Sequence, residues 1–325
     1  MLGELIAILA VLTFVGSNVI FRQTEREVSP AFINFFRTSV GTITYILVIL
    51  IINQFNLIFI IPGGLWLVLI SSFIFGQVIG DTAYFVAQKE LGTTIALAIS
   101  MTFPVFTFIL SLIFLGRTFD FNLILALFLI GFGITIIGKS KINTRNSNPI
   151  ESSISERNLK SKLDTLSKGD TIKAIGFCLI ASLGWAIGAV LIEFATVQID
   201  LIIHINELSS LIGNVIRFPF AAIILGSIIL RENISKKSIN NIQSNKKSLR
   251  TWALLLIASI IGTSLGAYLY TEAVHLAGAN IMALVASASP LFALPLTYLI
   301  NKEKITKFGF IGVILTIIGV TIILM

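Results

Sequence analysis

Charge is scarce in this chain of 325 residues, since Asp, Glu, Lys and Arg together make up 12% of it. A soluble domain carries about 25% charge, so roughly half of the charge that a water-facing surface needs is missing. Apolar residues make up 56% of the chain, and the mean hydropathy is +0.97. A helix needs about 20 apolar residues to cross a bilayer, and this sequence has room for many such helices. The composition excludes a soluble fold and predicts a protein that lies mostly in lipid.

Ligands for metals and nucleophiles for catalysis are scarce as well. The chain has one cysteine, Cys178, and two histidines. A single cysteine excludes an intrachain disulfide, and we interpret it as a small buried apolar residue. The sequence contains no phosphate-binding loop, nucleophile triad or metal cluster, which argues against an ATP-driven pump. We therefore expect no catalytic residue, no metal site, no cofactor and no nucleic-acid partner.

The apolar segments predict an all-α polytopic membrane protein with ten transmembrane helices. Long continuous apolar runs, without a two-residue alternation, argue against membrane strands. The expected spans are 3–21, 30–53, 64–88, 92–115, 120–138, 172–195, 206–230, 251–274, 279–300 and 306–325. The first segment carries Glu4 and lacks the positive residues of a signal peptide, so we interpret it as a span and not as a cleaved leader.

A polar, basic segment at 139–171 is typical of a linker and divides the chain into the halves 1–138 and 172–325. The halves resemble each other. Adding 186 to the positions of Gly76, Gly80, Tyr84, Ala87, Gly92, Pro104 and Phe106 gives Gly262, Gly266, Tyr270, Ala273, Gly278, Pro290 and Phe292. Adding 180 to Asn34 and Arg37 gives Asn214 and Arg217. Each half is therefore predicted to be one five-helix repeat.

An odd number of spans in each half has a topological consequence. The second half must enter the membrane from the opposite side, which predicts two inverted five-helix repeats. In such a pair, one set of contacts closes one face of the membrane while the related set opens the other. The pattern favours a transporter that works by alternating access.

Several short motifs resemble the EamA-type repeats of the drug/metabolite transporter superfamily. They are the doubled passages from Tyr84 to Pro104 and from Tyr270 to Pro290, Gly16-Ser17-Asn18, Trp185-Ala186, and Lys302-Glu303-Lys304. The resemblance covers the chain apart from the linker. It implies a ten-helix carrier that exports or exchanges a small metabolite, amino-acid-like or otherwise polar or amphipathic, and it leaves the cargo open.

Polar side chains recur in the third span at Gln77, Asp81, Tyr84 and Gln88, which places them on one helical face. Two interpretations stay open, a cavity wall in which Asp81 binds a cationic group or a proton, and a seam of hydrogen bonds between helices. We take Gln77, Asp81, Tyr84 and the repeat-related Tyr270 as candidate substrate-binding residues. Asn18 and Trp185 join them because they belong to motifs of the resembled family.

Arg37 and Arg217 lie inside predicted spans, each three residues after an asparagine. Three roles stay open for these arginines. They are gating or structural bridging, binding of an anionic substrate, and extension of the side chain to the membrane interface. Pro104 and Pro290 are expected to kink the fourth and ninth spans. The two Gly-x-x-x-Gly pairs at Gly76 and Gly262 predict close helix packing. Glu193 and Glu272 lie near predicted helix ends, where we expect contact with headgroups; His204 and His275 also lie near ends and resemble no metal site.

The basic residues predict the orientation, because cytoplasmic loops collect Lys and Arg. Of 23 such residues, 20 fall on the side that carries the linker and only Arg117 falls on the other. This count places loop 139–171 in the cytoplasm and the termini outside a cell membrane, whereas the family resemblance implies termini inside. The expected partners are a small-molecule substrate and the lipid bilayer. Whether the protein is a monomer or a homodimer stays open. A membrane enzyme acting on lipid, or a non-transporting membrane partner or sensor, is the alternative function.

Overall fold

The computed structural model describes residues 1–24, 27–91, 96, 99–118, 121–146, 168–205, 208–237, 248–289, 291–292 and 307–324. Within these ranges the chain forms helices and no strand. Six helical segments are long and apolar enough to cross a membrane: Leu2–Phe21, Ala31–Ile51, Gly63–Tyr84, Gly169–Ile203, Ser209–Arg231 and Leu249–Ala277. The all-helical, multi-pass class is confirmed. In the other four expected spans the described apolar helical segments are shorter, such as Phe103–Phe114, Phe121–Gly133 and Phe310–Ile322, so the count of ten stays a prediction.

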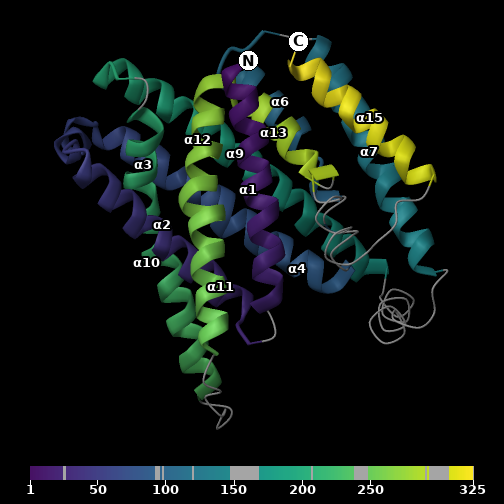
Figure 1. The fold of residues 1–325 in the computed structure, drawn as a ribbon, viewed down its shortest axis with the longest axis horizontal. Coiled ribbons are helices and arrows are strands. Elements are labelled where there is room, and N and C mark those ends of the chain that lie inside the picture. Colours follow the sequence, from purple (N-terminus) through teal and green to yellow (C-terminus); the bar gives the residue numbers. More distant parts are fainter. Residues whose placement is uncertain are drawn as a thin grey trace. The chain divides into compact units, whose positions relative to one another are not determined.

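One compact unit comprises Leu2–Ile74 and Leu191–Gly278. It contains α1 (Leu2–Thr24), α2 (Pro30–Ile51), η1 (Phe55–Ile60), α3 (Gly63–Phe73), the end of α9 (Lys168–Ile203), α10 (Ser209–Lys237), α11 (Leu249–Ser259), η4 (Ile260–Leu265) and α12 (Gly266–Ala277). In this unit α1 packs along α12, as Figure 1 shows, and α2 packs along α10. Tyr45, Leu69, Ile212 and Phe218 belong to its buried apolar core.

The other compact unit comprises Phe75–Val190 and Ala279–Met325, with Met1. It contains most of η2 (Ile74–Asp81), then α4 (Thr82–Leu91), α6 (Phe103–Phe114), α7 (Phe121–Asn146), the first part of α9, α13 (Ala279–Ser287) and α15 (Lys307–Leu324). Here α7 and α15 lie side by side (Figure 1), and α13 packs against α6 and α7. Cys178 is fully buried beside Ala87 and Ala174, which confirms its interpretation as a small apolar residue.

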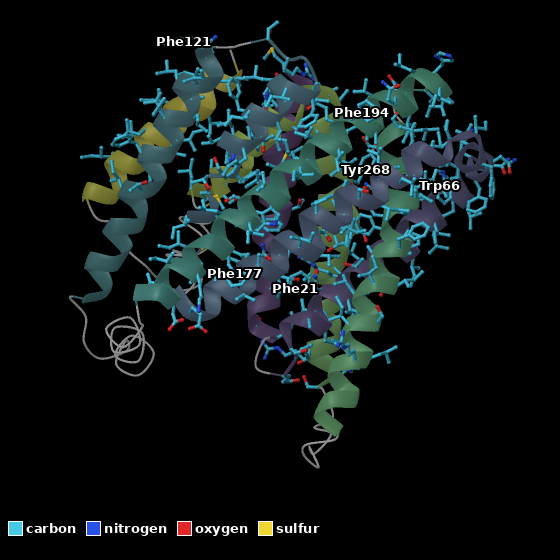
Figure 2. All side chains as sticks on the ribbon, turned by 180° about the vertical axis from the view of Figure 1, so that it is seen from behind. Phe21, Trp66, Phe121, Phe177, Phe194 and Tyr268 are labelled. Carbon is cyan, nitrogen blue, oxygen red and sulfur yellow. The ribbon has the colours of Figure 1, made fainter. Side chains whose placement is uncertain are left out.

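Large apolar side chains point outward in both units, and small residues fill the helix contacts. Phe59 is 72% exposed, Phe121 67% and Ile223 69%. Figure 2 shows such side chains standing out from the helices, with Phe121 labelled on α7. Alanine, serine and threonine dominate the buried positions, among them Ala7, Ala186 and Ser182. Outward apolar surface with small residues inside is the pattern of helices that pack together in lipid.

Two π-helices interrupt the third and eighth expected spans at matched positions. Adding 186 to the bounds of α3 gives the bounds of α11, and adding 186 to Ile74, where η2 begins, gives Ile260, where η4 begins. Both spans were predicted as uninterrupted helices. A π-turn bonds each N–H to the carbonyl five residues earlier, so its presence cannot be inferred from hydropathy.

A Gly-x-x-x-Gly pair lies within η2, and the matching pair spans η4 and the first residue of α12; both pairs lie against a neighbouring helix. A Cβ at Gly266 would lie 2.8 Å from Oγ1 of Thr13 on α1, and one at Gly262 would overlap Ser17. In the other unit, a Cβ at Gly80 would lie 2.7 Å from Cδ1 of Trp185 on α9. The predicted close packing at these glycines is therefore confirmed. A larger residue at these positions would force the helices apart.

Three expected boundaries differ from the structure. The helices α7 and α9 extend into both ends of the expected linker, and residues 147–167 lie outside the described residues. Helix α9 is 36 residues long, well beyond the expected 172–195. Helix α6 begins at Phe103, so Pro104 stands in its first turn and does not kink a continuous helix. Proline is favoured there because a first-turn N–H has no partner within the helix. Pro290 lies outside the described residues.

A matched pair of glycines on α7 tests the packing of α7 against α15. A Cβ at Gly133 would lie 2.6 Å from the carbonyl oxygen of Gly312, whereas a Cβ at Gly131 meets no atom within 4 Å. We expect Gly133→Ala to lower the free energy of unfolding by about 1–3 kcal/mol through overpacking. Gly131→Ala should be neutral or raise it by up to about 1 kcal/mol. Thermal unfolding of the purified protein measures both, and equal stability of the variants would contradict the contact.

Glu27, in the connection between α1 and α2, caps the N-terminus of α11. Its Oε2 accepts hydrogen bonds from the backbone N–H of Ser248 at 3.2 Å and from the hydroxyl of Thr251 at 2.7 Å. The side chain of Ser248 accepts the N–H of Thr251 at 3.1 Å. The Thr251 and Ser248 hydrogen bonds lower the pKa of Glu27 from its ordinary value of 4.5, because they favour the ionised form.

This contact makes stability depend on pH in a defined direction. Since the pKa of Glu27 is lower in the folded state, the stabilisation is complete above the ordinary value of 4.5 and is lost as the pH falls through the folded value. We expect the thermal midpoint of the unchanged protein to fall more than that of Glu27→Gln between about pH 6 and pH 3. Asp170→Asn, at an exposed residue beside Lys173, serves as the control. Parallel pH profiles for the unchanged protein and Glu27→Gln would show that the cap contributes nothing.

Candidate substrate site and buried polar network

Asp81, the last residue of η2, lies against Trp185 of α9. The indole Nε1–H of Trp185 donates to Oδ1 of Asp81 at 2.9 Å. Both side chains are partly buried. The two residues are 104 positions apart in the chain, so the contact depends on the packing of η2 against α9. The indole supplies a neutral donor to a carboxylate that would be costly to place in lipid.

Aromatic rings surround this contact within the same unit. The rings of Tyr84 and Trp185 lie 5.5 Å apart, and Phe103 meets Trp185 edge-on at 6.1 Å. Glycines make the approach possible, because a Cβ at Gly184 would lie 2.6 Å from the carbonyl oxygen of Phe75. The arrangement places one carboxylate beside several ring faces. Such a group can bind a polar or cationic part of a ligand while the rings contact its apolar part.

The structure brings together three of the six candidate substrate-binding residues, namely Asp81, Tyr84 and Trp185. Gln77 lies on η2, about one turn before Asp81, and is partly buried, and its role in binding stays a prediction. Asn18 on α1 and Tyr270 on α12 are partly buried and belong to the other unit. Their role in binding stays a prediction. The side chain of Gln88 lies outside the described residues.

The carbonyl that Pro104 leaves without an N–H partner is satisfied by another helix. Proline at position 104 cannot donate to the carbonyl of Ser100. The hydroxyl of Ser182 on α9 donates to that carbonyl at 2.8 Å and lies 3.0 Å from the hydroxyl of Thr102. This hydrogen bond links α9 to the segment before α6.

A second polar group, in the other unit, is centred on Arg217 of α10. Arg217 is 4% exposed and Asn214 is fully buried. The guanidinium donates through Nε to Oδ1 of Asn214 at 2.9 Å and through Nη2 to Oγ1 of Thr271 at 3.0 Å. The hydroxyl of Thr271 donates in turn to Asn214 at 3.1 Å. The three side chains tie α10 to α12.

Arg37 repeats part of this arrangement on α2. Its Nε donates to Oδ1 of Asn34 at 2.8 Å, which matches the bond between Arg217 and Asn214. The two Asn-x-x-Arg motifs therefore share a local hydrogen bond within their helices. The role of the two arginines, whether gating or structural bridging, anion binding or reaching to the interface, stays a prediction. In these bonds the acceptors are an asparagine amide oxygen and, for Arg217, a threonine hydroxyl.

Sequence reasoning missed Tyr45, which fixes η4 to α2. Its hydroxyl lies 2.8 Å from the carbonyl oxygen of Thr263 and 2.9 Å from that of Ser264, and donates to them. The hydroxyl of Ser264 donates to Thr44 at 2.9 Å. Tyr45 is 2% exposed, so its hydroxyl needs a protein partner. A lone tyrosine in an apolar run gave no signal of this role.

Two glutamates have buried side-chain atoms, although the sequence predicted that they contact lipid headgroups. Glu193 is 3% exposed on α9, ten residues before the end of that helix. Oε2 of Glu272 on α12 is buried. The error follows from the predicted helix ends, since α9 continues to Ile203 and carries Glu193 deeper into the helix than expected.

Comparisons with known proteins define the class and then the family. One solved crystal structure of a protein shares the fold, with a TM-score of 0.71 at 12% identity over 98% of this chain and 95% of that one. An uncharacterized transporter of Archaeoglobus fulgidus is 23% identical over 327 residues, covering 100% of this chain and 99% of its relative. Together with the apolar helices, these similarities define the class as a multi-pass, all-helical membrane protein.

The family follows from a direct match. The profile of the EamA-like transporter family matches residues 1–139 and 172–325. The chain belongs to the EamA-like transporter family, and the expected resemblance is confirmed. Membership favours a transporter over the alternatives of a lipid-acting enzyme and a non-transporting partner.

The Arg217 network predicts a large effect of a conservative change. Lysine keeps the charge but lacks the planar fork that bonds Asn214 and Thr271 together. We expect Arg217→Lys to lower the free energy of unfolding by about 2–3 kcal/mol, because a buried charged hydrogen bond is lost. Arg250→Lys, at an exposed residue of α11, is the control and should change stability little. Thermal unfolding that does not distinguish the two variants would show that the network does not hold α10 to α12.

Proposed function

We propose that the chain is a secondary transporter that moves a small polar or amphipathic metabolite, such as an amino-acid-like solute, by alternating access. Residues 1–138 and 172–325 form two inverted five-helix repeats, joined by the linker 139–171. Ten helices cross a cell membrane, and transport runs as export or exchange.

The matched π-helices are the observation that carries this proposal. The helices η2 and η4 begin 186 residues apart, and a Gly-x-x-x-Gly pair that starts in each of them lies against the first helix of a half, α9 or α1. Equivalent segments with equivalent partners are what inverted repeats require. A π-turn carries hydrogen bonds of a different spacing from the α-helix and often occurs at functional sites. These segments are therefore candidate hinges for opposite faces of the membrane.

Asp81, Tyr84 and Trp185 form the proposed substrate site. The carboxylate of Asp81 binds a polar group of the cargo, and the rings of Tyr84 and Trp185 bind its apolar part. The second repeat has Ala267 where the first has Asp81, so the carboxylate breaks the repeat symmetry. Because the fold does not require this carboxylate in both repeats, we assign it to binding of the transported solute.

Removal of the carboxylate tests the site. A metabolite-resolved comparison of a deletion strain with an overproducing strain identifies the transported solute, and its flux is then measured in proteoliposomes. We expect Asp81→Asn to lower the flux at least about tenfold, equivalent to about 1.4 kcal/mol of binding or barrier. Asp170→Asn, at an exposed residue near the start of α9, should keep full flux. Normal flux in Asp81→Asn would show that Asp81 does not bind the substrate.

The charge count supports a cytoplasmic loop 139–171 with both termini outside. The single native cysteine makes a direct test possible, because Cys178 can be replaced by alanine. In that background we expect Ser153→Cys to resist a membrane-impermeant thiol reagent in intact cells and to react after lysis. Reaction in intact cells would place the loop outside and reverse the orientation.

A further inference from the structure

A small cavity lies between α6, α7 and α13, all within one compact unit. It has about 210 Å³ of empty space, part of which is open to the surroundings, and its enclosed part has room for a group about the size of one water molecule. Its apolar lining residues are Pro104, Phe108, Leu123, Ile124, Leu127 and Leu284. Its polar lining residue is Asn280, the second residue of α13. None of these residues belongs to the Asp81 site or the Arg217 network.

Asn280 brings an unsatisfied polar atom to this apolar cavity. The residue is 9% exposed, and its Oδ1 is buried without a hydrogen-bond partner among the described residues. A buried acceptor without a partner costs free energy, and buried polar side chains in proteins are nearly always hydrogen-bonded. A ligand in the cavity that donates to Oδ1 would supply the missing bond.

A hydroxyl group is the partner that suits an asparagine amide in this setting. The amide has an accepting oxygen and two N–H donors. A hydroxyl both donates and accepts, so it satisfies the amide whichever way the oxygen and nitrogen are turned. A carboxylate only accepts and an ammonium only donates, and either would place a charge among apolar side chains at a cost in free energy. The polar end of the ligand is therefore a neutral hydroxyl.

The apolar walls determine the rest of the ligand. Phe108, Leu123 and Leu127 are partly exposed, so an aliphatic chain attached to the hydroxyl can extend over them, and burial of apolar surface favours binding. Helix α7 begins at Phe121, which places Leu123 and Leu127 about 3 Å and about 9 Å along it. The start of a helix that crosses the membrane lies near the boundary between headgroups and acyl chains, where amphipathic molecules collect.

We propose that this cavity binds a neutral aliphatic alcohol, with its hydroxyl hydrogen-bonded to Asn280 and its chain against the leucines of α7. Binding is non-covalent, and only hydrogen bonds form or break. A bilayer lipid with a free hydroxyl and a small alcohol share this chemistry. The site stands apart from the proposed function, because no residue of the proposed substrate site lines it.

Photolabelling tests the site in the full-length protein, purified into nanodiscs of phosphatidylcholine, a lipid without a free hydroxyl. The probe is an octanol that carries a diazirine, and mass spectrometry locates its adducts. We expect adducts on the cavity residues of α6, α7 and α13, displaced by octanol but not by octane at the same concentration. Adducts confined to outward residues such as Phe128, or equal displacement by octane and octanol, would overturn the proposal.

Truncation of Asn280 isolates the contribution of the amide. Asn280→Ala enlarges the cavity, so a lost effect cannot come from a blocked entrance. We expect the preference for octanol over octane to fall about fivefold, because a neutral hydrogen bond is lost. Asn56→Ala, at an exposed residue of η1, is the matched control and should keep the preference. An unaltered preference in Asn280→Ala would contradict the role of the amide, and the unchanged protein decides whether the site exists even if that variant fails to fold.

A second competition distinguishes the two sources of the hydroxyl. Dioleoylglycerol has a free hydroxyl and stays in the bilayer. Displacement of the probe by dioleoylglycerol would assign the site to a lipid, whereas displacement by octanol alone would assign it to a small alcohol. Displacement by neither would contradict the proposal and leave the cavity to water. Because no cargo or flux enters these measurements, their outcome is independent of the transport assay.

Discussion

The structure depends on one constraint, the requirement that polar groups in lipid be satisfied within the protein. With 12% charge, the chain has few groups with which to meet it. It does so with short-range pairs and with small residues that bring helices close. Ser182 satisfies the carbonyl that Pro104 leaves without a donor, and Tyr45 satisfies two carbonyls of η4. At these two places a hydroxyl from a neighbouring helix donates to backbone carbonyls.

The same requirement connects the π-helices to the proposed transport. Glycines at η2 and η4 allow α9 and α1 to approach, and the close approach places Trp185 beside Asp81. A bulky residue at Gly80 would remove both the packing and the hydrogen bond. The scaffold and the candidate site therefore depend on the same glycines. In the other unit the Asn214, Arg217 and Thr271 bonds link helices without a free carboxylate, which suits a structural role.

Sequence periodicity predicted the helical class, the offset of 186 and the glycine contacts, because these depend on residues close in the chain or on repeated patterns. The hydrogen bond within each Asn-x-x-Arg motif could be predicted from the sequence, because its two residues lie one helical turn apart. The π-helices could not be predicted, since a π-turn leaves the hydropathy of a span unchanged. The pairing of Trp185 with Asp81 and the role of Tyr45 depend on packing between segments more than 100 residues apart. The burial of Glu193 was missed because α9 extends beyond its predicted end.

The central claim is that this EamA-like family member carries its cargo by alternating access. The most direct measurement is solute exchange by the purified protein in proteoliposomes without ATP, using the solute that the strain comparison identifies. A carrier that exposes one site to each side in turn predicts a saturable flux that accelerates when the same solute is present on the opposite side. A flux that rises linearly with solute concentration and does not change when solute is present on the opposite side would contradict the claim.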